Sequence, residues 1–411
     1  MANTPAGSPA PQPRIASIDA LRGLVMLTMI FVNDLAGAPE KLVPDWMVHF
    51  SDRHGEGSGM TFVDLVFPAF LFIVGMSIPF ALGKSRPLVH HLRHIITRTL
   101  ALLVIGILMV NGEEGAPTAW YLAMFSSAIL AFCQIGPVTA AAETAKAWRY
   151  LNFSLRMLGY AGMLGCALTL HPHGHPMLTL LPFHIHTSWY GILGLIGWAY
   201  LVGALLFLFF RIQSTALLGC VALLTSFYAA DRHGFFDHFW PNHYVDFGGT
   251  LGSQAAITVA GLLLATCLLR PDTNGLAAKV RFVLLFIGGF AFAASLTAGL
   301  YGISKNAATP AWCFWADAIT ATLWLLFYFI CDVKPLPWLA QPLKLAGQNV
   351  LLAYLLSEML PSLLETLHLG NWYGSLAEGS LAGAVSRSLA CGIGVLAVAV
   401  GLNRLGFRLR L

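Results

Sequence analysis

Charged residues are what this sequence has least of. Asp, Glu, Lys and Arg make up 10% of the 411 residues, whereas hydrophobic residues make up 57% and the mean hydropathy is +0.72. Soluble domains carry about 25% charged residues, so this composition excludes an ordinary water-soluble globular protein. The net charge of +4 is explained better by membrane topology than by a nucleic-acid partner, and we expect none.

Two further absences narrow the class. The seven cysteines lie in apolar runs without any CxxC pair, so they are expected to be small core residues. The opening "MANTPAGSPAPQPR" has no apolar signal-peptide core and no cleavage signature. We therefore expect a disordered tail at 1–14, followed by a single transmembrane domain at 15–411 whose first helix is retained.

Apolar runs long enough to cross roughly 30 Å of hydrocarbon recur along the whole chain. They predict an all-α polytopic membrane protein with about 11–12 transmembrane helices in one bundle. We place twelve spans near residues 20–36, 62–83, 95–111, 118–138, 155–171, 188–210, 214–230, 250–269, 281–302, 311–331, 345–366 and 380–403.

The basic residues predict the orientation of these spans. If the N-terminus is cytoplasmic and the spans alternate, 18 of the 23 Lys and Arg residues fall on the cytoplasmic side. Basic residues are retained on that side during insertion, so both termini are expected to be cytoplasmic. Membrane lipid is therefore an expected partner.

Histidines are distributed the other way, since only His90, His91 and His94 fall inside. Two outer segments, at 171–189 and 231–247, are rich in histidine, proline and aromatic residues. Imidazole is a common metal ligand, but no cysteine or close carboxylate accompanies these histidines. We therefore expect no metal, and a lid that faces the substrate explains these segments better.

Polar residues gather where the first two spans meet the outer surface. The first span ends in Asn33, and "SDRHGEGSGMTFVDLVFPAFLFIVGMSI" at 51–78 places His54 and Asp64 where the second begins. A carboxylate inside a span is costly unless it is paired or faces a wet cavity. An imidazole can act as a base or carry an acyl group, and an amide can stabilise an oxyanion. The alternative is a loop histidine, with Asp64 near a helix N-terminus where the helix dipole favours it.

The motifs of this region resemble the heparan-α-glucosaminide N-acetyltransferase family of transmembrane acetyltransferases, in its bacterial branch. The first helix ends in Phe31-Val32-Asn33, and "HGEGSGMTFVDLVFP" follows the family's His-to-Asp block. Later segments at 194–201, 251–258, 305–312 and 347–349 also resemble family signatures. Gly57 stands where the family has a tryptophan. The alignment also admits His49, although only His54 keeps the ten-residue step to Asp64.

The resemblance implies transfer of acetyl from cytoplasmic acetyl-CoA, a co-substrate, to an amino sugar of the glucosamine type on the periplasmic side of a bacterial inner membrane. It gives His54 the central catalytic role, as base or acetyl carrier, with Asn33 and Asp64 beside it. An acetyl-histidine and a direct transfer are both open, as are N- and O-acetylation. The animal members favour a homodimer.

Two further groups of residues have expected roles in binding. Basic residues at cytoplasmic helix ends are candidates for the phosphates of acetyl-CoA, although each also serves as an ordinary topology signal; they are Arg22, Lys84, Arg86, Arg93 and Arg98. Asn349 and Lys305 lie in family-like motifs and are candidates for the substrate pocket.

A proton-coupled secondary transporter of a sugar or a related small solute is the alternative function. Twelve helices with both termini inside suit a transporter, and outer histidines suit proton coupling. However, "SIDALRG" and "DLVFPAFLFIVG" have no residue-level repeat in 206–411.

Overall fold

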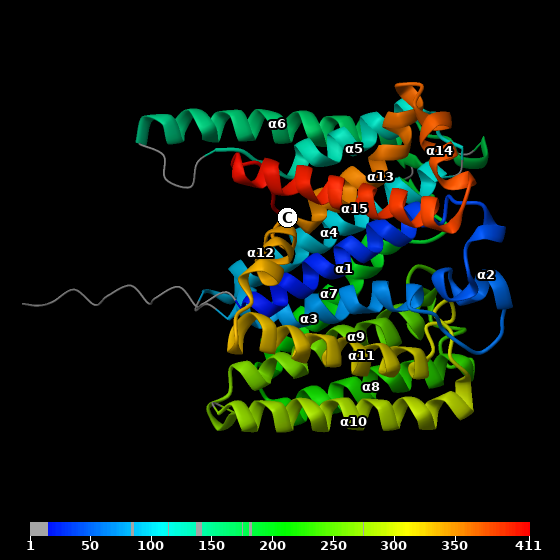
Figure 1. Ribbon diagram of the computed structural model, residues 1–411. Coiled ribbons are helices and arrows are strands. Elements are labelled where there is room, and N and C mark those ends of the chain that lie inside the picture. The colour runs from blue at the N-terminus through cyan, green and yellow to red at the C-terminus, as the bar shows by residue number, and fades with distance from the viewer. Residues whose placement is uncertain are drawn as a thin grey trace, which may run out of the picture.

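The structure is a computed structural model that describes residues 15–411 except 84–85, 114, 137–141, 175, 181–182 and 274. The predicted tail at 1–14 and the candidate phosphate ligand Lys84 therefore lie outside the described residues. Long helices run side by side across the molecule, and the described chain forms one bundle (Figure 1).

Fifteen α-helices, nine short 3-10 or π helices and two small pairs of strands make up the described secondary structure. The helices are α1 (Ala16–Leu35), α2 (Phe50–His54), α3 (Val66–Leu82), α4 (Leu88–Glu113), α5 (Thr118–Phe132), α6 (Ala142–Thr169), α7 (Gly191–Phe210), α8 (Ser214–Arg232), α9 (Ala255–Ala265), α10 (Leu276–Tyr301), α11 (Pro310–Tyr328), α12 (Pro337–Ala346), α13 (Val350–Thr366), α14 (Gly370–Glu378) and α15 (Leu381–Arg404). The strands pair antiparallel, β1 (Cys133–Gln134) with β4 (Arg408–Leu409) and β2 (Leu178–Leu180) with β3 (Phe183–Ile185).

The prediction of an all-α polytopic membrane protein is confirmed. Among the described residues, nine helices are long and apolar enough to span a membrane, or ten if a bent pair is one span. Each of the twelve predicted spans contains a helix, but in three of them the helix is not by itself long and apolar enough to span a membrane. Helix α5 has only 15 residues, α6 carries several basic residues along its first half, and α13 turns by 111° into α14.

The predicted role of the cysteines is also consistent with the structure. All seven are free thiols, and all but Cys391 are buried. Small apolar side chains of this kind fill gaps between helices.

The centre of the bundle is built on close contact between small residues. The segment Gly249–Leu268, which contains α9, is 83% buried, whereas α10 is only 22% buried and lies at the periphery. Gly75 on α3 and Gly261 on α9 lie against the facing backbone, because a Cβ built on them would fall 1.8 Å from Thr258 O and 2.0 Å from Phe72 O. Small residues that let backbones approach are typical of membrane helix interfaces.

This contact predicts a strong effect of Gly75→Val on stability. The new side chain would force α3 and α9 apart, and overpacking of this kind costs about 1–3 kcal/mol. The matched control is Gly288→Val on α10, where nothing lies within 4 Å of the added Cβ. Thermal unfolding in detergent should show a lower midpoint for Gly75→Val alone, and equal midpoints would contradict the close packing.

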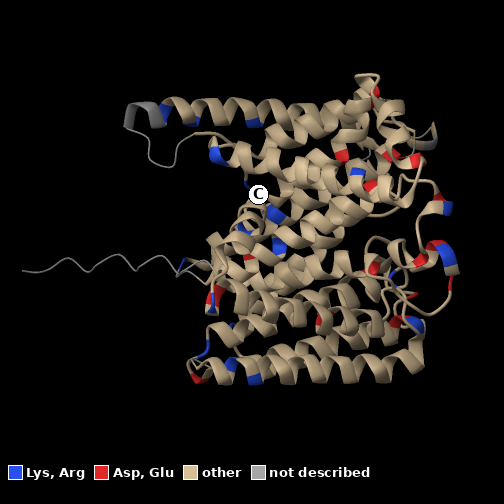
Figure 2. Cartoon of the chain, in the orientation of Figure 1, with Lys and Arg blue, Asp and Glu red and all other residues tan. Residues whose placement is uncertain are grey.

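The two ends of the bundle differ in charge. Helix α1 begins and α15 ends at one end, where Lys and Arg gather, and we call it the basic end (Figures 1 and 2). At the opposite end, where α1 ends at Leu35 and α2 lies, Asp and Glu are frequent (Figure 2). We call this the acidic end. The predicted orientation, with both termini cytoplasmic, depends on this division of charge.

Candidate functional site

The loop between α1 and α3 is folded around a buried carboxylate at the acidic end. Asp64 lies in a short 3-10 turn before α3, and its side chain is 3% exposed. Its Oδ2 accepts the backbone N–H of Thr61 at 3.0 Å and that of Phe50, the first residue of α2, at 3.1 Å. The same carboxylate thus orders the loop and the start of α2.

His49 completes a hydrogen-bonded pair with this carboxylate. Its Nδ1 lies 2.7 Å from Asp64 Oδ1, and the side chain of His49 is 36% exposed. When Nδ1–H donates to the carboxylate, the tautomer is set and Nε2 keeps the lone pair that can accept a proton. A half-exposed imidazole oriented by a buried acid is a typical arrangement for a general base or a nucleophile.

Lys305 brings the loop between α10 and α11 to the same imidazole. Its Nζ lies 3.2 Å from Nδ1 and 3.3 Å from Nε2 of His49. Burial lowers the pKa of Lys305, although the carboxylates of Asp64 and Asp52 act in the opposite direction.

Three contacts hold this second loop in place. Gly59 N–H donates to Ile303 O at 2.9 Å, and Ile303 N–H donates to Ser58 Oγ at 2.8 Å. Trp312 Nε1 donates to the backbone oxygen of Asp64 at 3.1 Å. The contact between Lys305 and His49 therefore rests on two anchored loops.

His54, the histidine favoured by spacing, lies elsewhere. It is the last residue of α2 and is exposed, with its ring tilted against that of Phe50 at 4.5 Å between centroids. The structure brings Asp64 together with His49 and Lys305, and it does not bring His54 to Asp64. The ten-residue spacing between His54 and Asp64 does not bring the two side chains together, because the helix and turns between 50 and 62 fold the chain back on itself.

Asn33 lines a different cavity at the acidic end. Its Nδ2 donates to Glu358 Oε1 at 3.1 Å, and both side chains line a cavity of about 180 Å³. Glu113, Trp189 and Tyr354 lie in the same wall. Sequence reasoning missed Glu113 and Glu358, although Glu358 stands inside the apolar run "LLAYLLSE" and an acid in such a run is a functional signal.

Neighbouring contacts fix the end of α1 on which Asn33 stands. The Asp34 carboxylate accepts from Tyr373 at 2.6 Å, Ser388 at 2.6 Å and Arg387 at 3.0 Å. Arg387 is nearly buried and also donates to Asp34 O at 2.7 Å. These contacts from α14 and α15 hold the backbone beside Asn33.

A larger cavity of about 580 Å³ opens toward the basic end. Arg22, Arg98 and Asn349 line it together with Arg410, which sequence reasoning missed. Arg22 is held by Asp19 at 2.9 Å and Ser77 at 2.6 Å, while the Arg98 guanidinium lies 4.7 Å from the centre of the Tyr200 ring. The Nε of Arg98 is buried without a hydrogen-bond partner.

Other candidate residues lie apart from this cavity or serve the fold. Asn349 donates to Phe407 O at 3.3 Å and accepts from Leu409 N–H at 3.2 Å, so it holds the C-terminal strand against α13. Arg86 and Arg93 are exposed and do not line the cavity, and Arg86 contacts His90. Only Arg22 and Arg98 of the predicted phosphate ligands therefore lie at this cavity, within the described residues.

The two cavities adjoin inside the bundle. Both are lined by Ile192 and Leu193 on α7 and by Tyr354 on α13. The cavity near the basic end is therefore separated from the one at Asn33 and Glu358 by a wall that α7 and α13 share. In the described chain, no group of three or more His, Cys, Asp or Glu residues is arranged to hold a metal ion.

Nine candidate spans among the described residues define a multi-pass membrane protein, and two adjoining cavities lie within its bundle. Residues 14–121 match the family model described as "Domain of unknown function (DUF5009)". The chain is also similar to heparan-alpha-glucosaminide N-acetyltransferase of Homo sapiens, 34% identical over 113 residues, and of Mus musculus, 31% identical over 112 residues.

These matches cover a limited part of each protein. Each covers 26% of this chain and 16% of the relative's length. The resemblance inferred from the motifs is confirmed to this extent. The stretch matched by the family model contains Asn33, His49, His54 and Asp64, whereas Lys305 lies outside it.

Proposed function

We propose that this protein is a transmembrane acetyltransferase, which takes acetyl from acetyl-CoA at the basic end and transfers it to an amino sugar at the acidic end. The observation that carries the proposal is the pair of adjoining cavities, with arginines at one end and Asn33 at the other. In this account the basic end is cytoplasmic and the acidic end periplasmic, in agreement with the retention of basic residues inside.

The larger cavity suits the donor. The phosphates of CoA would bind Arg22, Arg98 and Arg410, because guanidinium groups pair well with phosphate oxygens. The apolar side chains farther along the cavity, among them Met26 and Met29, would line the pantetheine arm. The thioester would then reach the wall shared with the smaller cavity, near Tyr354.

The smaller cavity suits the acceptor. Carboxylates of Glu113 and Glu358 line it and would attract the ammonium group of an amino sugar, while Trp189 offers an aromatic face to the sugar ring. The amide of Asn33, held by Glu358, would donate to the oxygen of the acetyl group. This assignment favours N-acetylation over O-acetylation.

His49 is proposed as the residue that accepts the proton, in place of His54. The bond to Asp64 orients its ring, with Lys305 Nζ 3.3 Å from Nε2, and it lies in the loop that follows α1, the helix that carries Asn33. The bound ammonium group first loses one proton to water. The neutral amine nitrogen then forms a bond to the carbonyl carbon of the thioester and gives up a second proton to the imidazole. The carbon–sulfur bond then breaks, and the sulfur leaves as CoA thiolate and takes a proton to give free CoA.

The donor site predicts a selective effect of Arg98→Gln. Loss of a charge-assisted hydrogen bond to phosphate costs about 1.5–3 kcal/mol, so the KM for acetyl-CoA should rise about 10- to 150-fold. The KM for the sugar should stay unchanged. The matched control is Arg93→Gln, on the same helix but exposed and outside the cavity.

These constants are measured with purified protein in detergent, labelled acetyl-CoA and glucosamine, by counting acetylated sugar and released CoA. Equal KM values for the two arginine variants would remove the larger cavity from donor binding. Folded protein that releases no CoA with any amino sugar would favour the sugar transporter, for which uptake into proteoliposomes is the assay.

A further inference from the structure

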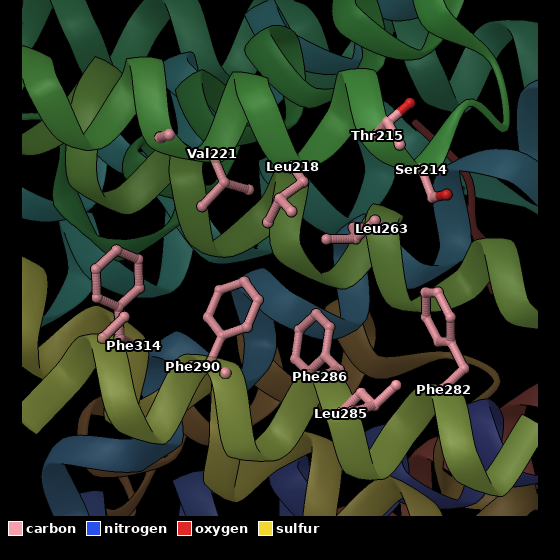
Figure 3. Close-up of a pocket in the computed structure, with 13 residues that line it drawn as sticks. Ser214, Thr215, Leu218, Val221, Leu263, Phe282, Leu285, Phe286, Phe290 and Phe314 are labelled. Atoms are coloured by element: carbon pink, nitrogen blue, oxygen red, sulfur yellow. The ribbon is translucent and has the colours of Figure 1, made fainter.

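A third cavity lies between α8 and α10, on the periphery of the bundle and apart from the two adjoining cavities. Its volume is about 490 Å³. Figure 3 shows Phe282, Phe286 and Phe290 pointing from α10 toward α8, with Leu218 and Val221 pointing back from α8. The only hydroxyl side chains in its wall, Ser214 and Thr215, stand at one end, at the start of α8.

The shape of the cavity matches one extended hydrocarbon chain. Its wall on α10 runs from Phe282 to Ala293, which is about 16 Å at 1.5 Å per residue. One leaflet of the hydrocarbon core is about 15 Å thick.

The mouth of the cavity carries the charge that a phosphate headgroup requires. Ser214 contacts the Arg270 guanidinium, which also pairs with Asp272 at 2.5 Å. Lys279 and Arg281 lie in the first two turns of α10, beside Phe282. The chain beside this end of the cavity thus carries Arg270, paired with Asp272, and two further basic residues at the start of α10. Basic groups near the membrane surface attract anionic lipids.

We propose that this cleft binds one anionic phospholipid of the leaflet at the basic end. One acyl chain lies between α8 and α10 against Phe282, Phe286 and Phe290, and the phosphate lies near Lys279 and Arg281. The site is separate from the two adjoining cavities, so it does not depend on the proposed acetyl transfer.

Two neighbouring glycines on α10 provide a matched test. Gly289 lines the cleft and Gly288 does not, and neither has an atom within 4 Å of an added Cβ. Gly289→Leu should fill the cleft and lower the retention of phosphatidylglycerol at least about tenfold, whereas Gly288→Leu should retain it like the wild type. Native mass spectrometry after detergent exchange measures the bound lipid.

Charge variants test the headgroup. In mixtures of phosphatidylglycerol and phosphatidylcholine, Lys279→Gln and Arg281→Gln should each lower the preference for phosphatidylglycerol about fivefold. Lys334→Gln, exposed beyond α11, should not. If Gly289→Leu fails to fold, Ala293→Phe fills the same cleft.

Equal lipid retention by the two glycine variants would overturn the proposal, and so would equal binding of both lipids by the wild type. Loss of a dimer in Gly289→Leu without loss of lipid would assign the cleft to a second copy of this chain instead.

Discussion

His49→Ala should abolish acetyl transfer, whereas His54→Ala should leave it nearly unchanged. General acid–base catalysis contributes about 10²- to 10⁴-fold, and the imidazole of His49 is the one that Asp64 orients at 2.7 Å. His54 is exposed, with its ring tilted against that of Phe50. Exposed substitutions of this kind change free energies by about 0.5 kcal/mol or less, equivalent to about twofold in rate.

The two histidines lie on the same short segment, so they control for each other. The rate at saturating acetyl-CoA and glucosamine is the measurement, with binding of CoA as the check on folding. Loss of activity in His54→Ala with a normal rate in His49→Ala would show that His54, ten residues before Asp64, is the functional histidine. Loss in neither would remove both imidazoles from the reaction.

Glu358→Gln should weaken binding of the amino sugar without weakening binding of acetyl-CoA. Gln keeps the size of the side chain and removes the charge that would hold the ammonium group. A charge-assisted hydrogen bond is worth about 1.5–3 kcal/mol, so the KM for glucosamine should rise about 10- to 150-fold. The KM for acetyl-CoA depends on the larger cavity and should not change.

Glu365→Gln is the control for this variant. Glu365 is on the same helix, two turns farther along, where it is exposed and accepts a hydrogen bond from Thr118 at 2.7 Å. It lines neither of the adjoining cavities. Equal changes in both KM values for Glu358→Gln would indicate a structural role for this carboxylate, and an unchanged KM for glucosamine would place the acceptor outside the smaller cavity.

The spans were predictable because hydropathy decides which segments enter a membrane. The twelve predicted spans all contain helices, and the three that fail the test alone have local causes. Helix α6 has Lys146, Arg149 and Arg156 along its length, while α13 ends in a turn at His368 with a positive φ of 56°. Such turns depend on backbone geometry that a hydropathy pattern does not contain.

The candidate site was predictable only in part. Asp64 was found because an acid at the start of an apolar run needs a partner, and Lys305 was found through its motif. The choice between His49 and His54 depended on the path of the loop from 36 to 62, which has no hydrophobic periodicity from which to predict it. Glu358 met the same criterion as Asp64, and applying that criterion to the eleventh predicted span would have identified it.

Transfer across a sealed membrane is the measurement that tests the central claim most directly. Protein reconstituted in one orientation would be given labelled acetyl-CoA on the side of the basic end and glucosamine only on the opposite side. The account predicts acetylated glucosamine on the acidic side with free CoA left on the basic side, and neither product with His49→Ala. Acetylated sugar on the same side as acetyl-CoA, or transport of unmodified glucosamine without CoA release, would contradict it.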